Sequence, residues 1–180
     1  QQEEIHDYFM ESDSDNIEVA LREFDGDYDI DGLTATTLLL DAFSSFGFKN
    51  VKAFIPNRFT EGYGLTIDAV ERIVADGAQL IVTVDCGSLS HAEIARAKEL
   101  GVDVIVTDHH NVAPEQPPAV GVVNPKRLLQ DYPQAYEKYV LRDEAVEGAT
   151  IEDVSLPALY PFLDLPGVGV AFKLVQALQT

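Results

Sequence analysis

The sequence has little cysteine and no long apolar run. Cys86 is the single cysteine in 180 residues, which excludes an internal disulfide and fits a reducing compartment. No apolar run approaches the roughly 20 residues that a membrane span needs. No basic segment followed by an apolar stretch predicts a signal peptide. We therefore expect a soluble, cytoplasmic protein with no membrane partner, long enough for one domain with a hydrophobic core.

Basic residues are also scarce. Lys and Arg number 12 against 31 Asp and Glu, which gives a net charge of −19, and residues 1–31 hold much of the excess. Because affinity for phosphates normally comes from Lys and Arg, such a chain repels nucleic acid at long range. Bound divalent cations would cancel part of the charge locally. Adaptation to high salt or an acidophilic partner would also explain it, and composition leaves these alternatives open.

Strand-like and helix-like segments alternate along the chain. Apolar spacing and end signals predict helices at 34–46, 66–77, 90–101 and 168–179. Strands are predicted at 18–24, 51–55, 79–85, 102–108 and 119–123. Ser90 and Glu93 predict a capping box at the third helix. The apolar runs "QLIVTVD" and "VDVIVTD" are typical of strands buried on both faces. The alternation predicts an α/β fold, a three-layer sandwich with a mainly parallel central sheet flanked by helices.

Acidic residues or histidines follow three of these strands. In chain order they are Asp25, Asp27, Asp29 and Asp31 in "FDGDYDIDG", Asp85 in "IVTVD", and Asp108, His109 and His110 in "VIVTDHH". Ligands of open parallel sheets bind at the carboxyl ends of the strands, so these side chains are expected at one edge. A single aspartate at a loop start is common. Three coincident strand ends, whose carboxylates would repel one another, predict a divalent metal site.

The types of ligand narrow the choice of metal. Carboxylates and imidazoles without a thiolate cluster suit Mn²⁺ or Mg²⁺ better than structural zinc. So many ligands predict two ions about 3.5–4 Å apart, bridged by a shared carboxylate as in metal-assisted phosphoryl hydrolysis. Asp85 is the candidate bridge. The segment Gly32-Leu-Thr, which leads into the first predicted helix, adds backbone N–H groups near that edge that suit a phosphate oxygen.

Five segments, in order, resemble the motifs of the DHH phosphoesterase superfamily. They are "GDYDIDG" (26–32), "IPNRFTEGYGL" (55–65), "VDCG" (84–87), "TDHH" (107–110) and "VVNPKR" (122–127). The sequence around these motifs resembles that of the RecJ branch of the superfamily, whose members are single-strand-specific 5′→3′ DNA exonucleases. "LPGVGVAFKLVQAL" (165–178) is similar to the sequence that follows in that branch. One motif alone would be weak, whereas five in order make a specific match.

The resemblance implies a role for each matching residue. Asp29 and Asp31 would each ligate one Mn²⁺ (Mg²⁺ is the alternative), Asp85 would bridge both ions, and His109 would complete a coordination sphere. His110 would lie near the scissile phosphate, as a ligand or as a hydrogen-bond donor. The ions would then activate water for attack on phosphorus.

Other positions have two interpretations each. Asp25 stands where relatives often carry His, Tyr or Phe, and is either an extra oxygen ligand or a neighbour of the site. Asp108 is a candidate for the catalytic group or a support for the ligands. The substrate-binding candidates are Arg58, Gly62, Gly64, His110 and Asn124, although the two glycines also fit simple turns and Asn124 also fits a strand end.

The predicted organisation has four parts. Residues 1–16 form an acidic lead-in, 17–127 the DHH catalytic core, 128–163 an acidic insertion or linker, and 164–180 the final helix of the DHH lobe. Since the first residue is Gln and not Met, we expect either a processed product or a fragment of a longer chain. From the resemblance, we expect the fourth metal motif of the family, its DHHA1 domain and its OB domain to lie outside the 180 residues.

The predicted function is 5′→3′ exonuclease action on single-stranded DNA in repair or recombination. The expected partners are the 5′ end of single-stranded DNA and, as candidates, single-strand-binding or replication proteins. Two alternatives stay open: a DHH phosphodiesterase acting on oligonucleotides or cyclic nucleotides, and a non-catalytic DHH scaffold of the replication complex.

Overall fold

Five parallel strands form the central sheet of the computed structural model, which describes residues 5, 8–9, 16–21, 30–55, 65–127 and 164–179, with the backbone alone at 16–21. Their order is β2-β1-β3-β4-β5. The bounds are β1 Asn16–Leu21, β2 Asn50–Phe54, β3 Leu80–Val84, β4 Asp103–Thr107 and β5 Gly121–Val123. Every pair of neighbouring strands is parallel, which confirms the predicted sheet.

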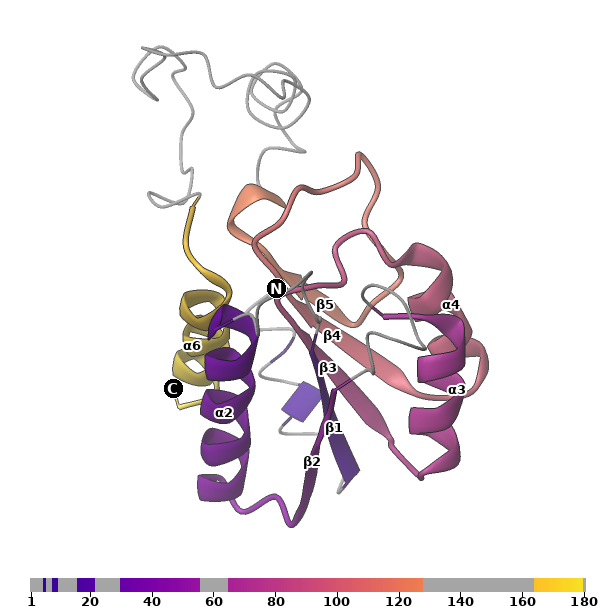
Figure 1. Cartoon of the computed structure of the whole chain (residues 1–180), viewed down its shortest axis with the longest axis horizontal. Coiled ribbons are helices and arrows are strands. Elements are labelled where there is room, and N and C mark those ends of the chain that lie inside the picture. The colour runs from indigo at the N-terminus through magenta and orange to yellow at the C-terminus, as the bar shows by residue number, and fades with distance from the viewer. Residues whose placement is uncertain are drawn as a thin grey trace.

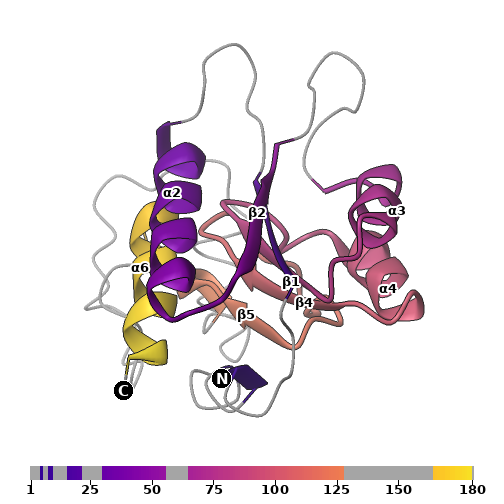
Figure 2. The ribbon, with the colours of Figure 1, turned by 90° about the horizontal axis from the view of Figure 1, so that it is seen from below.

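Helices cover both faces of this sheet (Figures 1 and 2). Helices α2 (Ile30–Ser45) and α6 (Gly167–Leu178) pack together on one face, and α3 (Ile67–Ala75) and α4 (His91–Glu99) pack on the other. The predicted three-layer α/β sandwich is confirmed.

The central strand, β3, explains why both faces of the sheet are apolar. All five residues of β3 are buried, and its side chains alternate between the layers. Leu80, Val82 and Val84 belong to the core under α2 and α6, whereas Ile81 belongs to the core under α3 and α4. Period-two alternation sends successive side chains to opposite faces, so a strand covered on both sides reads as a continuous apolar run.

Two local predictions were wrong. Helix α2 begins at Ile30 and not at residue 34. The apolar spacing did not indicate this earlier start, because the first turn contains the polar Asp31 and an exposed Ile30. Gly32 consequently lies within the first turn. Ser90 precedes α4 as its N-cap, but its side chain makes no capping hydrogen bond, so the capping box does not form. None of the described helices is long and apolar enough to cross a membrane.

Candidate metal centre

The carboxyl ends of β3, β4 and β5 lie side by side. Val84 is paired with Thr107, and Thr107 with Val123, so the three strands end in register. The backbone N–H of Asp85 donates to the carbonyl of Thr107 at 2.9 Å, and that of Asp108 to the carbonyl of Val123 at 3.0 Å. The backbone hydrogen bonds between strands thus continue one residue beyond β3 and β4, and they fix the backbone positions of Asp85 and Asp108.

A tight turn after β3 orients Asp85. Among the described residues, Asp85 is the only one other than glycine with a positive φ, 58°, a region that Asp tolerates better than bulkier residues. Gly87 follows at a φ of 108°, and a Cβ there would lie 2.6 Å from Thr83 Oγ1. Thr83 Oγ1 in turn donates to the carbonyl of Cys86 at 2.8 Å. The turn therefore holds Asp85, which is only 1% exposed, in one position at the sheet edge.

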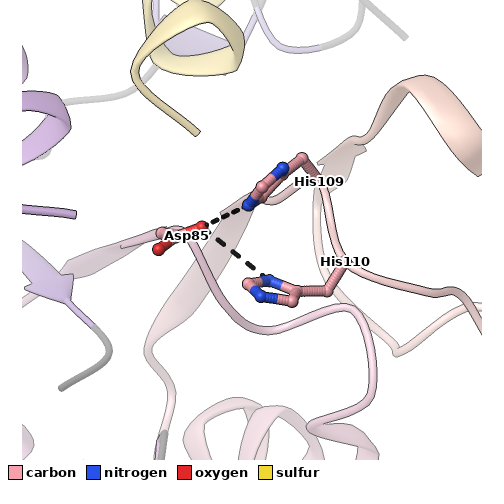
Figure 3. A group of neighbouring side chains, drawn as sticks. All are labelled: Asp85, His109 and His110. Atoms are coloured by element: carbon pink, nitrogen blue, oxygen red, sulfur yellow. Dashed lines mark ion pairs between the residues drawn. The ribbon is translucent and has the colours of Figure 1, made fainter. Parts of the chain in front are cut away.

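Two histidines converge on Asp85 (Figure 3). His109 Nε2 lies 2.9 Å from Asp85 Oδ1 and 3.8 Å from Asp31 Oδ2. His110 Nδ1 lies 3.7 Å from the same Asp85 oxygen. The hydrogen bond to Asp85 raises the pKa of His109, and the charges of Asp85, Asp31 and Asp108 add to that effect against the opposing effect of burial. The edge therefore attracts positive charge.

Asp108 lies behind this group and organises it. One of its oxygens accepts the backbone N–H of His109 at 2.8 Å, the backbone N–H of His110 at 3.0 Å and His110 Nδ1 at 2.8 Å. Its other oxygen accepts the N–H of Ser88 at 3.0 Å. Burial alone would raise the pKa of Asp108, but these hydrogen bonds outweigh it and hold the pKa well below the usual range. Asp108 is thus a buried, ionised acceptor.

Asn124 joins the loops after β3, β4 and β5. Its side-chain N–H groups donate to Ser88 Oγ at 2.9 Å and to the carbonyl of His110 at 3.0 Å. Its Oδ1 accepts the backbone N–H of Lys126 at 2.8 Å. With only 7% of the residue exposed, these contacts make Asn124 a support for the loop that carries His110.

The geometry of the group fits a hard divalent cation. One ligand atom from each of Asp85, His109 and His110 can be chosen so that all lie within 4.8 Å of one another. A cation with bonds of about 2.1 Å holds its ligand atoms at most about 4.2 Å apart. The separation of 2.9 Å between Asp85 Oδ1 and His109 Nε2 meets that limit, so these two residues can ligate one ion with little movement. Carboxylate oxygen with imidazole nitrogen is also a donor set that manganese accepts.

The structure brings together part of the predicted site. Asp31, Asp85, His109 and His110 meet at the sheet edge, with Asp108 and Asn124 directly behind them. Other predicted site residues lie outside the described residues: Asp25, Asp29, Arg58, Gly62 and Gly64.

Sequence reasoning missed the contribution of α6. The backbone N–H groups of Gly167 and Val168 donate to the two oxygens of Asp31 at 2.6 and 2.7 Å. The signal was present as "PGVGV", but its meaning depends on a contact between residues 136 positions apart.

The sequence of the chain matches a known protein family. The sequence profile of the DHH family, N-terminal domain, matches residues 25–180. The chain belongs to the DHH family. This DHH-family chain is 41% identical over 155 residues to the single-stranded-DNA-specific exonuclease RecJ of Escherichia coli, which covers 86% of this chain and 22% of the relative. The RecJ of Bacillus subtilis is 40% identical over 153 residues, which covers 85% and 16% respectively.

Solved structures share the DHH fold. A crystal structure of exonuclease RecJ bound to manganese matches with a TM-score of 0.67 at 32% identity, over 99% of this chain and 37% of that one. A structure of RecJ in complex with Mn²⁺ from Thermus thermophilus matches with a TM-score of 0.60 at 29% identity, over 99% and 20%. The chain spans about a fifth of the length of the curated relatives it matches.

Proposed function

We propose that this DHH domain holds manganese at the carboxyl edge of its sheet and forms part of a phosphodiesterase site. The observation that carries the proposal is the convergence of Asp85, His109 and His110, delivered by two adjacent strands. The domain is similar to RecJ proteins, and two RecJ crystal structures contain manganese, which supports the choice of metal. Mg²⁺ is the alternative cation, since it shares the preference for carboxylate ligands.

The ligands have distinct roles in this proposal. Asp85 would be the ligand shared by two Mn²⁺ ions, His109 and Asp31 would each ligate an ion, and Asp29 with Asp25 would complete the acidic set. The ions, when bound, supply Lewis-acid activation of water and stabilise charge that develops on phosphate. The protein's own contribution is to keep these groups fixed and partly dry, because oriented charges act more strongly where water is excluded.

His110 is proposed to act beside the metals. Asp108 stays ionised and accepts from His110 Nδ1 at 2.8 Å, so it holds the proton on that nitrogen. The other ring nitrogen, Nε2, is then the atom available to a metal or to a phosphate oxygen. Asn124 holds the same loop through the carbonyl of His110. Asp108 and Asn124 are therefore positioning residues, and His110 is the group that meets the substrate.

For the whole protein, we propose 5′→3′ exonuclease action on single-stranded DNA in repair or recombination, in the cytoplasm. Relatives named as single-stranded-DNA-specific exonucleases support this substrate. Arg58, Gly62 and Gly64 are proposed to contact the DNA backbone. Such contacts with phosphate are needed because the net charge of −19 opposes binding. Single-strand-binding or replication proteins are the proposed protein partners.

The test incubates the 180-residue chain, and the longest natural form of the protein, with 5′-phosphorylated single-stranded DNA and Mn²⁺. Asp85→Asn removes a ligand charge while keeping a residue that tolerates positive φ. Asp103→Asn is the matched control, because Asp103 is exposed at the opposite end of β4. We expect Mn²⁺-dependent release of mononucleotides by the longest form, lost in Asp85→Asn and retained in Asp103→Asn.

Each other outcome has a definite meaning. Equal digestion by Asp85→Asn would contradict the assigned site. Digestion of dinucleotides in preference to long strands would replace the exonuclease with an oligonucleotide phosphodiesterase. No hydrolysis by the longest form, despite bound Mn²⁺, would favour the non-catalytic scaffold.

A further inference from the structure

The first turn of α6 is attached to Asp31 of α2. The N–H of Gly167 donates to Asp31 Oδ2 at 2.6 Å, and the N–H of Val168 donates to Asp31 Oδ1 at 2.7 Å. Pro166, at the N-cap position of α6, makes no side-chain capping hydrogen bond. Asp31 therefore caps α6 from another helix and satisfies N–H groups that have no partner within α6 itself.

The same turn passes close to Asp85. A Cβ built at Gly167 would lie 3.0 Å from Asp85 Oδ1 and 3.2 Å from its Cβ and Cγ. Asp85 has little freedom to retreat, since it is 1% exposed and its backbone is fixed at a φ of 58°. The yellow helix α6 approaches the three site residues in Figure 3. Any side chain at this position would force the Asp85 carboxylate or the start of α6 to move by a few tenths of an ångström, and glycine avoids that shift.

The hydrogen bonds to Asp31 and the close approach of Gly167 to Asp85 involve the two carboxylates that lie within 4 Å of the ring nitrogen Nε2 of His109. Asp85 and Asp31 lie 2.9 and 3.8 Å from His109 Nε2. Unshielded, the two carboxylates would repel each other, and the positive end of the α6 dipole offsets part of that repulsion. A carboxylate oxygen has a second lone pair, so Asp31 can accept from α6 and still face a cation.

We propose that the start of α6 is a positioning element of the metal centre. The N–H groups of Gly167 and Val168 fix the Asp31 carboxylate toward His109, and the missing side chain of Gly167 leaves Asp85 in its ligating position. The positioning role rests on the proposed metal site, whereas the contacts of α6 with Asp31 and Asp85 are made within the chain itself.

The first experiment measures amide hydrogen exchange in the metal-free chain. Asp31→Ala removes both acceptors, so the amides of Gly167 and Val168 are expected to exchange at least about tenfold faster, because each loses its hydrogen bond. The amide of Val170, which donates to the carbonyl of Pro166 at 3.0 Å, is the internal reference. Unchanged exchange at Gly167 and Val168 would overturn the proposal whether or not the chain binds metal.

The second experiment compares Gly167→Ala with Gly169→Ala by calorimetric titration with Mn²⁺. Gly169 is a matched control, because a Cβ there is also crowded, at 2.7 Å, but by the side chain of Leu165 and not by Asp85. Gly167→Ala is expected to weaken Mn²⁺ binding by about 10- to 100-fold, the range for groups that orient metal ligands. Gly169→Ala is expected to bind as the parent chain does.

Thermal unfolding of the metal-free variants separates positioning from general damage. Both variants are expected to unfold cooperatively within a few degrees of the parent. Equal Mn²⁺ affinity in the two variants would overturn the positioning role of Gly167. If the parent chain bound no Mn²⁺, the proposed function would fail instead, and amide exchange would still decide whether Asp31 and α6 are coupled.

Discussion

Asp108 and His110 are joined twice: one carboxylate oxygen of Asp108 accepts both the backbone N–H of His110 at 3.0 Å and its ring Nδ1 at 2.8 Å. The double contact fixes the direction of the ring as well as the position of the chain. Because Asp108 is 2% exposed and its pKa is held well below the usual range, the acceptor stays charged at neutral pH. The site thus has a rigid support independent of bound metal.

Asp108→Asn is expected to destabilise the metal-free chain by about 2 kcal/mol, since charge-assisted hydrogen bonds to several N–H donors are lost. An amide can turn only one oxygen toward those donors, so some of them face an NH₂ group. The free energy of unfolding in urea measures this effect. Asp103→Asn, at an exposed position, is the control and is expected to stay within about 0.5 kcal/mol of the parent. Equal stability of the two variants would contradict the assigned role.

Lowering the pH should reduce the difference in unfolding free energy between the parent chain and Asp108→Asn. The folded pKa of Asp108 lies below its unfolded value of about 3.9. A group with a lowered folded pKa stabilises the fold above the unfolded pKa, and this contribution is lost as the pH falls through the folded pKa. The difference in unfolding free energy is expected to be constant from pH 7 to 5 and to shrink below pH 4. A difference as large at pH 3 as at pH 7 would show that Asp108 acts through packing alone.

Mn²⁺ affinity is expected to rise as the pH increases above about 6.5, the ordinary pKa of histidine. The pKa of His109 is raised by its hydrogen bond to Asp85, so the metal-free imidazole keeps its proton to a higher pH than an ordinary histidine does. A metal ligand must be neutral, so binding releases that proton. Calorimetry in two buffers with different ionisation enthalpies detects the release. Affinity that is independent of pH would mean that His109 does not ligate.

His109 also affects the stability of the metal-free chain, with the opposite sign to Asp108. A raised folded pKa contributes stability that is fully present below the unfolded pKa of about 6.5 and is lost as the pH rises through the folded pKa. The metal-free chain should therefore lose this contribution above pH 6.5, the range in which Mn²⁺ binding gains strength. Replacement of His109 by Ala should abolish both trends.

Gly87→Ala is expected to destabilise the chain more than Gly77→Ala. Both residues have positive φ, 108° and 89°, so a side chain at either position costs about 1–2 kcal/mol of backbone strain. A Cβ at Gly77 meets nothing within 4 Å, whereas at Gly87 it would lie 2.6 Å from Thr83 Oγ1 and add a packing cost of about 1–3 kcal/mol. Urea unfolding measures the difference, and equal losses would contradict a crowded turn behind Asp85.

The sheet and the meeting of the site residues were predictable because they follow from local patterns. The apolar runs at β3 and β4 each end just before an aspartate, and parallel pairing then forces Asp85 and Asp108 to one edge. The positions of His109 and His110 follow directly from that of Asp108. Nothing long-range was needed beyond the rule that parallel strands end together.

What could not be predicted depends on distant contacts or on exact backbone angles. The capping of α6 by Asp31 joins residues 136 positions apart, and no local pattern indicates it. The start of α2 at Ile30 could not be predicted from apolar spacing, because the first turn of the helix is polar. Asn124 was a candidate for substrate binding, but its three hydrogen bonds within the chain could be known only from the folded loops.

The most direct test of the account is a calorimetric titration of the metal-free 180-residue chain with Mn²⁺, beside Asp85→Asn and Asp103→Asn. The account predicts saturable binding by the parent and by Asp103→Asn, and a loss of at least about tenfold in affinity for Asp85→Asn, whose side chain is the shared contact of both histidines. Binding of equal strength by all three proteins, or no binding by the parent, would contradict a metal centre at this edge.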